Sequence, residues 1–134
     1  MSAAAGRVVL VVEDESIIRM MLVDALEDAG FVTVEAGHAA AAIARFEARP
    51  DIAAVVTDLR MPGAMDGLGL ARWMHSHAVH VPIIVTSGLA RLPDAADLNP
   101  CIMRVVTKPY DPAEVAGWVA ELFDPAAALV DLPP

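Results

Sequence analysis

The sequence alternates short apolar segments with segments of helical character, and this alternation restricts the fold more than any other feature. Residues 8–12 form a continuous run of Val and Leu, the pattern of a strand buried on both faces of a sheet. Similar runs predict four further strands at residues 31–35, 53–57, 82–86 and 103–107. Strands that alternate with helices form a parallel sheet covered on both faces. We therefore expect an α/β fold with a single doubly wound, five-stranded parallel sheet.

Helical periodicity fills the intervals between the predicted strands. Apolar residues at helical spacing predict helices at residues 17–29, 39–48, 68–77 and 112–123. Gly30 is placed to end the first of these helices, and Asp111 is placed to begin the last. Between residues 89 and 100, two prolines leave room only for a short or distorted helix.

The length and the charge limit the organisation of the chain and its partners. A chain of 134 residues corresponds to one domain, which we place at residues 7–123, after a flexible N-terminus (1–6) and before a C-terminal tail (124–134). The net charge of −9 argues against binding to nucleic acid or to an anionic membrane surface, since both require clustered Lys and Arg.

Features that bear on the cellular compartment agree with one another. The apolar run at residues 8–12 is too short to span a bilayer, and it lacks the basic flank of a signal peptide. Cys101 is the only cysteine, so no disulfide can form within the chain, and this suits a reducing compartment. We therefore expect a cytoplasmic protein.

Polar residues that could bind a metal ion or take part in a reaction follow four of the five predicted strands. Glu13 and Asp14 follow the first strand, Asp58 the third, Ser87 the fourth and Lys108 the fifth. The carboxyl ends of parallel strands share one edge of the sheet, where ligands bind in open α/β folds. Side chains that are up to 95 residues apart in the sequence are therefore expected to converge on one small site.

These residue types make chemical sense as a group. Two carboxylates in close contact repel each other by about 4 kcal/mol at an effective dielectric near 20, so three of them require a cation. Oxygen ligands and an incoming phosphate favour Mg²⁺ over Zn²⁺. One carboxylate could then act as a nucleophile toward phosphorus, with a lysine and a hydroxyl stabilising the oxygens of the transferring phosphoryl group.

The same segments resemble the response-regulator receiver family, the CheY-like domains of two-component signal transduction. The matching motifs, in chain order, are Val11-Val12-Glu13-Asp14-Glu15, Val56-Thr57-Asp58-Leu59-Arg60-Met61-Pro62-Gly63, Met65-Asp66-Gly67, Pro82-Ile83-Ile84-Val85-Thr86-Ser87-Gly88 and Thr107-Lys108-Pro109-Tyr110. Each motif alone is a weak signal, but their order along residues 7 to about 123 is specific. The resemblance implies a flavodoxin-like strand order of 2-1-3-4-5.

The resemblance also implies a role for each residue of the group. Asp58 would be the phosphoacceptor, and a sensor histidine kinase or a histidine phosphotransfer protein would donate the phosphoryl group. Mg²⁺ would be held by Glu13, Asp14, Asp58 and the backbone carbonyl of Arg60. Lys108 would contact the phosphoryl oxygens, and its peptide bond to Pro109 would be cis.

The hydroxyl of the site is a choice between two neighbours, Thr86 and Ser87. In the family the hydroxyl usually lies five residues after the proline that opens the fourth strand, and this spacing from Pro82 favours Ser87. Because side chains alternate along a strand, only one of the two faces the site, and Thr86 is kept as the alternative.

The expected output is contact with a downstream protein or with a second copy of the chain, and not enzymatic turnover of a separate substrate. Rival readings are a phosphorelay intermediate, a phosphate sink, a receiver fragment of a hybrid histidine kinase, and an interaction module that is not phosphorylated. A phosphatase of the haloacid dehalogenase type would need a second Asp at position 60, where this chain has Arg60. Val105 departs from the family pattern, which often has Tyr or Phe three residues before the lysine.

Overall fold

A computed structural model describes residues 6–60, 65–77, 79–88 and 99–123. The strands are β1 (Val8–Val12), β2 (Val32–Ala36), β3 (Ile52–Asp58), β4 (Ile83–Ser87) and β5 (Ile102–Thr107). The helices are α1 (Ser16–Asp28), α2 (Ala39–Ala48), α3 (Gly67–Ser76) and α5 (Pro112–Phe123). The predicted N-terminal segment up to residue 5, residues 89–98 of the segment expected to form a short or distorted helix, and the tail at 124–134 lie outside the described residues.

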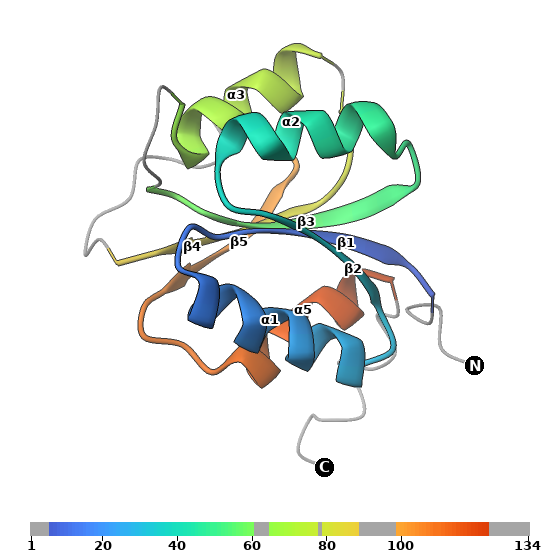
Figure 1. The fold of residues 1–134 in the computed structure, drawn as a ribbon, viewed down its shortest axis with the longest axis vertical. Coiled ribbons are helices and arrows are strands. Elements are labelled where there is room, and N and C mark those ends of the chain that lie inside the picture. Colours follow the sequence, from blue (N-terminus) through green and yellow to red (C-terminus); the bar gives the residue numbers. More distant parts are fainter. Residues whose placement is uncertain (1–5, 61–64, 78, 89–98, 124–134) are drawn as a thin grey trace.

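The strands form one parallel sheet in the order β2-β1-β3-β4-β5, as predicted. Helices α1 and α5 cover one face of this sheet, and α2 and α3 cover the other (Figure 1). The doubly wound α/β fold is thereby confirmed. Because both faces are covered, strands such as β1 bury every side chain, which explains why the sequence shows a continuous apolar run there instead of an alternating one.

The sheet separates two hydrophobic cores that use alternate residues of the same strands. The core under α1 and α5 includes Val9, Val11, Val56, Ile84 and Val106. The core under α2 and α3 contains instead Val8, Leu10, Val55, Ile83 and Val85. Because the strands are clamped from both sides, their carboxyl ends have a fixed position at the edge of the sheet where the predicted site lies.

Helix α1 is ended by Gly30 and helix α5 is capped by Asp111 through the local interactions that the sequence predicted. Gly30 has a φ of 98°, and its N–H donates to Glu27 while the N–H of Phe31 donates to Leu26. This Schellman arrangement satisfies the last carbonyls of α1. At the start of α5, the carboxylate of Asp111 accepts the N–H of Ala113 at 2.9 Å, as expected of an N-cap.

Four predicted strand starts were wrong by one residue: β3 and β5 begin one residue earlier than expected, and β2 and β4 begin one residue later. The two late starts have reasons that lie in the backbone. The N–H of Phe31 is used by the end of α1, so β2 begins at Val32. Pro82 has no N–H to give to the ladder, and β4 therefore begins at Ile83. The carbonyl of Pro82 still accepts the N–H of Val55 at 3.0 Å, which aligns β4 with β3.

Candidate functional site

Three carboxylates meet at the carboxyl edge of the sheet, as the sequence predicted. Glu13 and Asp14 follow β1, and Asp58 is the last residue of β3. Each of the three offers an oxygen that lies within 4.8 Å of the others. Within the described ranges, this is the only group of three His, Cys, Asp or Glu side chains close enough to hold a metal ion.

The lysine after β5 reaches into this acidic group. The Nζ atom of Lys108 donates to Oδ2 of Asp58 at 2.8 Å and lies 3.5 Å from Oε2 of Glu13. The backbone N–H of Lys108 donates to the carbonyl of Ser87 at 2.7 Å, which ties the segment after β5 to the end of β4. The Lys108–Pro109 peptide bond is cis, as expected. Side chains from three strand ends are thus brought together, although Lys108 is 50 residues from Asp58 and 95 residues from Glu13 in the sequence.

Burial shifts the pKa of Glu13 and the pKa of Lys108 in opposite directions, yet both pKa values end above their ordinary values. Burial, together with the nearby charge of Asp58, raises the pKa of Glu13 to about 7, against the hydrogen bond from Glu15 and the charge of Lys108. Burial alone would lower the pKa of Lys108, but the hydrogen bond and charge of Asp58, together with the charge of Glu13, outweigh it, so this pKa lies above its ordinary value. The site therefore holds more negative charge than one ammonium group can neutralise.

The donor set fits a divalent cation with a preference for oxygen. All three side chains offer carboxylate oxygens, and Asp14 is exposed at the mouth of the site whereas Glu13 and Asp58 are buried. Hard oxygen ligands with one side open to water match Mg²⁺, which keeps several of its own waters.

The predicted backbone ligand, Arg60, lies beside the phosphoacceptor candidate. Its N–H donates to Oδ1 of Asp58 at 3.3 Å. This bond fixes the backbone just after β3 to the Asp58 side chain. That the carbonyl of Arg60 would bind a cation stays a prediction.

The two candidate hydroxyls occupy neighbouring positions at the end of β4, and both are buried. In the sheet register Thr86 pairs with Asp58, and Ser87 pairs with Thr107. Strict alternation puts Thr86 on the same face as Ile84, whereas Ser87 is the last residue of the strand and lies one step nearer the carboxyl edge. Alternation alone does not decide between the two, and the preference for Ser87 stays a prediction.

Gly67 supports Asp58 in a way that sequence reasoning missed. A Cβ atom at this first residue of α3 would meet the carbonyl of Asp58 and lie 2.8 Å from Cα of Leu59. The N–H of Gly67 donates to the carbonyl of Leu59 at 2.9 Å. Only a glycine lets α3 approach the backbone of the phosphoacceptor candidate so closely. The Met65-Asp66-Gly67 motif was the available signal, but it did not indicate what the glycine contacts.

Asp66 begins α3 and does not join the acidic group within the described residues. Its Oδ1 atom accepts the N–H of Gly69 at 2.9 Å, which makes it the N-cap of the helix. At the other end of α3, the ring of His77 stacks on Trp73 with centroids 4.3 Å apart. Packing and capping thus account for these polar residues.

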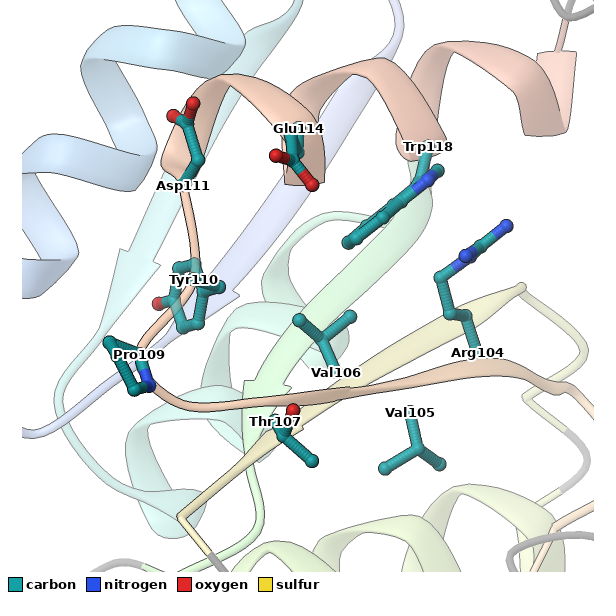
Figure 2. Close-up of a pocket in the computed structure, with 9 residues that line it drawn as sticks. All are labelled: Arg104, Val105, Val106, Thr107, Pro109, Tyr110, Asp111, Glu114 and Trp118. Atoms are coloured by element: carbon teal, nitrogen blue, oxygen red, sulfur yellow. The ribbon is translucent and has the colours of Figure 1, made fainter.

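A groove of about 580 Å³ lies beside the site, between β5 and the start of α5 (Figure 2). Arg104 and Val106 point from β5 toward α5, and the guanidinium of Arg104 lies 4.3 Å from the ring centre of Trp118. Val105 points to the opposite side of the strand, where it packs against the core under α2 and α3. The family's usual aromatic position is therefore filled here by a small, partly buried residue.

Comparison with known proteins identifies relatives of this chain. The family model described as the response regulator receiver domain matches residues 9–120. The response regulator receiver protein CpdR of Brucella abortus is 32% identical over 116 residues, which are 86% of this chain and 95% of CpdR. The regulatory protein AtoC of Escherichia coli is 34% identical over 105 residues, or 77% of this chain, and the match spans only 22% of AtoC.

A solved structure agrees with these relatives. The response regulator receiver protein from Pseudomonas putida has a TM-score of 0.77 with this chain and is 30% identical to it, covering 88% of this chain and 98% of the other. None of the helices in the described ranges has the length and apolar character that crossing a membrane requires.

Proposed function

The chain belongs to the response regulator receiver domain family, and on this premise we propose that Asp58 accepts a phosphoryl group from a phosphohistidine. The donor would be a sensor histidine kinase or a histidine phosphotransfer protein. The observation that carries the proposal is the 2.8 Å contact between Lys108 Nζ and Asp58 Oδ2 inside a group of three carboxylates. This arrangement combines a nucleophile, Asp58, with an ammonium group, Lys108, that could contact phosphoryl oxygens, and with carboxylates that could bind a metal ion.

In the proposed reaction, a carboxylate oxygen of Asp58 attacks phosphorus and forms an acyl phosphate. The phosphorus–nitrogen bond of the donor breaks, and its imidazole leaves with the bonding electron pair as a neutral ring when its other nitrogen carries a proton. Lys108 would turn from the Asp58 carboxylate to the phosphoryl oxygens, and Ser87 would donate a hydrogen bond to another of them. Charge develops on those oxygens, so donors fixed in advance lower the barrier.

Mg²⁺ would be held by Glu13, Asp14, Asp58 and the backbone carbonyl of Arg60. When bound, it supplies positive charge that neutralises the carboxylates and the incoming phosphoryl oxygens. The three acids support this assignment because their oxygens lie within 4.8 Å of one another and are of the type that Mg²⁺ prefers.

The consequence of the modification would be a switch read by another protein. A phosphoryl group adds a charge of roughly −1.5 to −2 near neutral pH and would draw Lys108 and Ser87 toward it. Ser87 ends β4 and Lys108 directly follows β5. Their movement would therefore bias the conformation of the segments that follow these strands. Apart from its own phosphorylation and dephosphorylation, the domain would catalyse no reaction.

The proposal is tested by incubation with acetyl phosphate and Mg²⁺, followed by mass spectrometry of the intact protein. The wild type should gain the mass of one phosphoryl group, and the Asp58→Asn variant should gain none. Asp51→Asn is the matched control, because Asp51 is an exposed aspartate paired with Arg49 away from the site, and it should be labelled like the wild type. A wild-type protein that stays unmodified at saturating Mg²⁺ would contradict the proposal.

A further inference from the structure

The segment that carries the acids after β1 is held in place by one hydrogen bond to the end of β2 and one within its own turn. The N–H of Glu13 donates to the carbonyl of Ala36, at the end of β2, at 3.0 Å. The N–H of Glu15 donates to Oε1 of Glu13 at 3.1 Å, which fixes the carboxylate of Glu13 against its own turn. Glu13 lies beyond the last paired residue of β1, so its carbonyl needs a donor from outside the strand ladder.

Arg19, on the first turns of α1, provides that donor. Its Nη1 atom donates to the carbonyl of Glu13 at 2.7 Å, and its Nε atom donates to Oε1 of Glu35 at 3.1 Å. The backbone N–H of Arg19 also donates to the carbonyl of Glu15 at 2.9 Å. One residue thus contacts both ends of the acidic turn and the strand beside it.

The two side-chain contacts of Arg19 differ in their surroundings. The carboxylate of Glu35 is half exposed, and an ion pair of this kind contributes little because water screens it. The carbonyl of Glu13 belongs to a residue that is completely buried, and the bond to it is short and assisted by the charge of the guanidinium. The contact with Glu13 is therefore the one that has consequences for the site.

We propose that Arg19 is a positioning residue for the metal site, because its bond to the carbonyl of Glu13 orients the turn from which Glu13 and Asp14 present their carboxylates. This inference rests on the proposed function, in which these acids bind Mg²⁺. Arg19 touches neither the cation nor the phosphoryl group and acts through the backbone of Glu13. Groups that orient metal ligands in this way typically change metal affinity by about 10- to 100-fold when they are removed.

The sign of the effect separates positioning from simple electrostatics. A guanidinium near a cation site repels the cation, so charge alone predicts that its removal strengthens Mg²⁺ binding. Positioning predicts the reverse, because the turn loses its fixed orientation. Arg45 provides a matched control: it is an exposed arginine whose Nε atom donates to the backbone carbonyl of Glu35 at 3.0 Å, at the same end of β2 but without contact to the acidic turn.

The experiment measures Mg²⁺ dissociation constants of the metal-stripped protein by NMR titration, following the amide signals of Asp14 and Lys108. Arg19→Ala should weaken Mg²⁺ binding about tenfold, whereas Arg45→Ala and Glu35→Gln should remain within about twofold of the wild type. Arg19→Lys, which keeps the charge and one donor, should recover part of the loss. The dispersion of the amide spectrum shows whether each variant is folded.

If the folded Arg19→Ala variant binds Mg²⁺ as tightly as the wild type, or more tightly, the inference is wrong. The proposed function is not affected by that result. An equal loss in Arg45→Ala also overturns it, because the effect would then not depend on the bond to Glu13. If the wild type itself binds no Mg²⁺ and accepts no phosphoryl group from acetyl phosphate, the proposed function fails and the inference falls with it. If Arg19→Ala does not fold, Arg19→Gln replaces it, with a smaller loss expected in the same direction.

Discussion

At Glu13 the chain buries a carboxylate completely, a depth of burial that the sequence analysis did not predict although it placed this residue in the site. The side chain has no exposed surface, and its pKa is raised to about 7 from an ordinary value of 4.5. Its neighbours come from other strands: Asp58 is the last residue of β3, and Lys108 directly follows β5. The property that matters chemically at this residue is therefore set by residues far away in the sequence.

We predict that, without Mg²⁺, the wild type loses stability relative to Glu13→Gln as the pH rises from about 5 to about 8. The folded protein keeps a proton on Glu13 up to about pH 7, whereas the unfolded chain has lost it above about 4.5. The stabilisation that this proton provides is complete below the lower value and disappears as the pH passes through the higher one. Thermal unfolding of both proteins in EDTA across this range measures the difference, and parallel curves would contradict it.

We also predict that Ser87→Ala slows labelling by acetyl phosphate by at least about tenfold, as expected when one donor to the transferring group is lost. Thr86→Val, which keeps the shape of the side chain, should have a much smaller effect. Ser87 is favoured as the hydroxyl of the site because it is the last residue of β4 and its carbonyl accepts a hydrogen bond from the N–H of Lys108. Initial rates of labelling in the two variants decide the choice, and a larger loss in Thr86→Val would reverse the assignment.

Among the elements, the start of α3 and the end of β3 approach each other closely near the site. Asp66 caps the helix, and Gly67 lies directly against the backbone of Asp58 and Leu59. Backbone cannot yield to a new side chain as a flexible side chain can. The position of α3 along β3 therefore depends on a single missing methyl group.

We predict that Gly67→Ala destabilises the protein by about 1–3 kcal/mol, because the added Cβ overlaps backbone atoms of Asp58 and Leu59. The variant should also bind beryllofluoride with Mg²⁺ more weakly, since Asp58 must shift. Gly117→Ala is the matched control: this glycine is exposed within α5 with nothing near its Cβ position, and the change should stabilise the protein by up to about 1 kcal/mol. Chemical denaturation of both variants gives the comparison. Equal effects would show that the contact with Asp58 is not what makes residue 67 a glycine.

The molecule as a whole carries a net charge of −9, and much of that charge lies on exposed side chains. Two acids near the end of α1, Asp24 and Asp28, have no basic partner in the last turn of the helix. Like charges that are only partly screened by water oppose the compact state. The stability of this domain should therefore depend on ionic strength as well as on Mg²⁺.

We predict that the melting temperature in EDTA rises as KCl increases from about 10 mM to about 200 mM, because the screening length falls from about 30 Å to below 10 Å. The rise should be smaller in the double variant Asp24→Asn/Asp28→Asn. Scanning calorimetry in a buffer of constant pH measures both curves. A melting temperature that falls with salt would mean that attractive ion pairs outweigh the repulsion.

Interactions between residues close in the sequence were predictable, because they need no knowledge of the fold. The apolar run of β1 gave a buried strand, Gly30 ended α1, and Asp111 capped α5. The order of strands and helices then determined the doubly wound sheet, since right-handed crossovers leave few alternatives. The convergence of Glu13, Asp58 and Lys108 followed from that topology, because parallel strands end at a common edge.

Only the tertiary structure decided how the site is supported and how its charges behave. The bond from Arg19 to the carbonyl of Glu13 depends on how α1 is rotated against β1, and the contact of Gly67 with Asp58 depends on how far α3 slides along β3. The pKa of Glu13 depends on the depth of burial, which no local pattern encodes. Sequence periodicity specifies which face of an element is apolar, whereas the rotation, depth and spacing that place individual atoms are settled only when all the elements pack together.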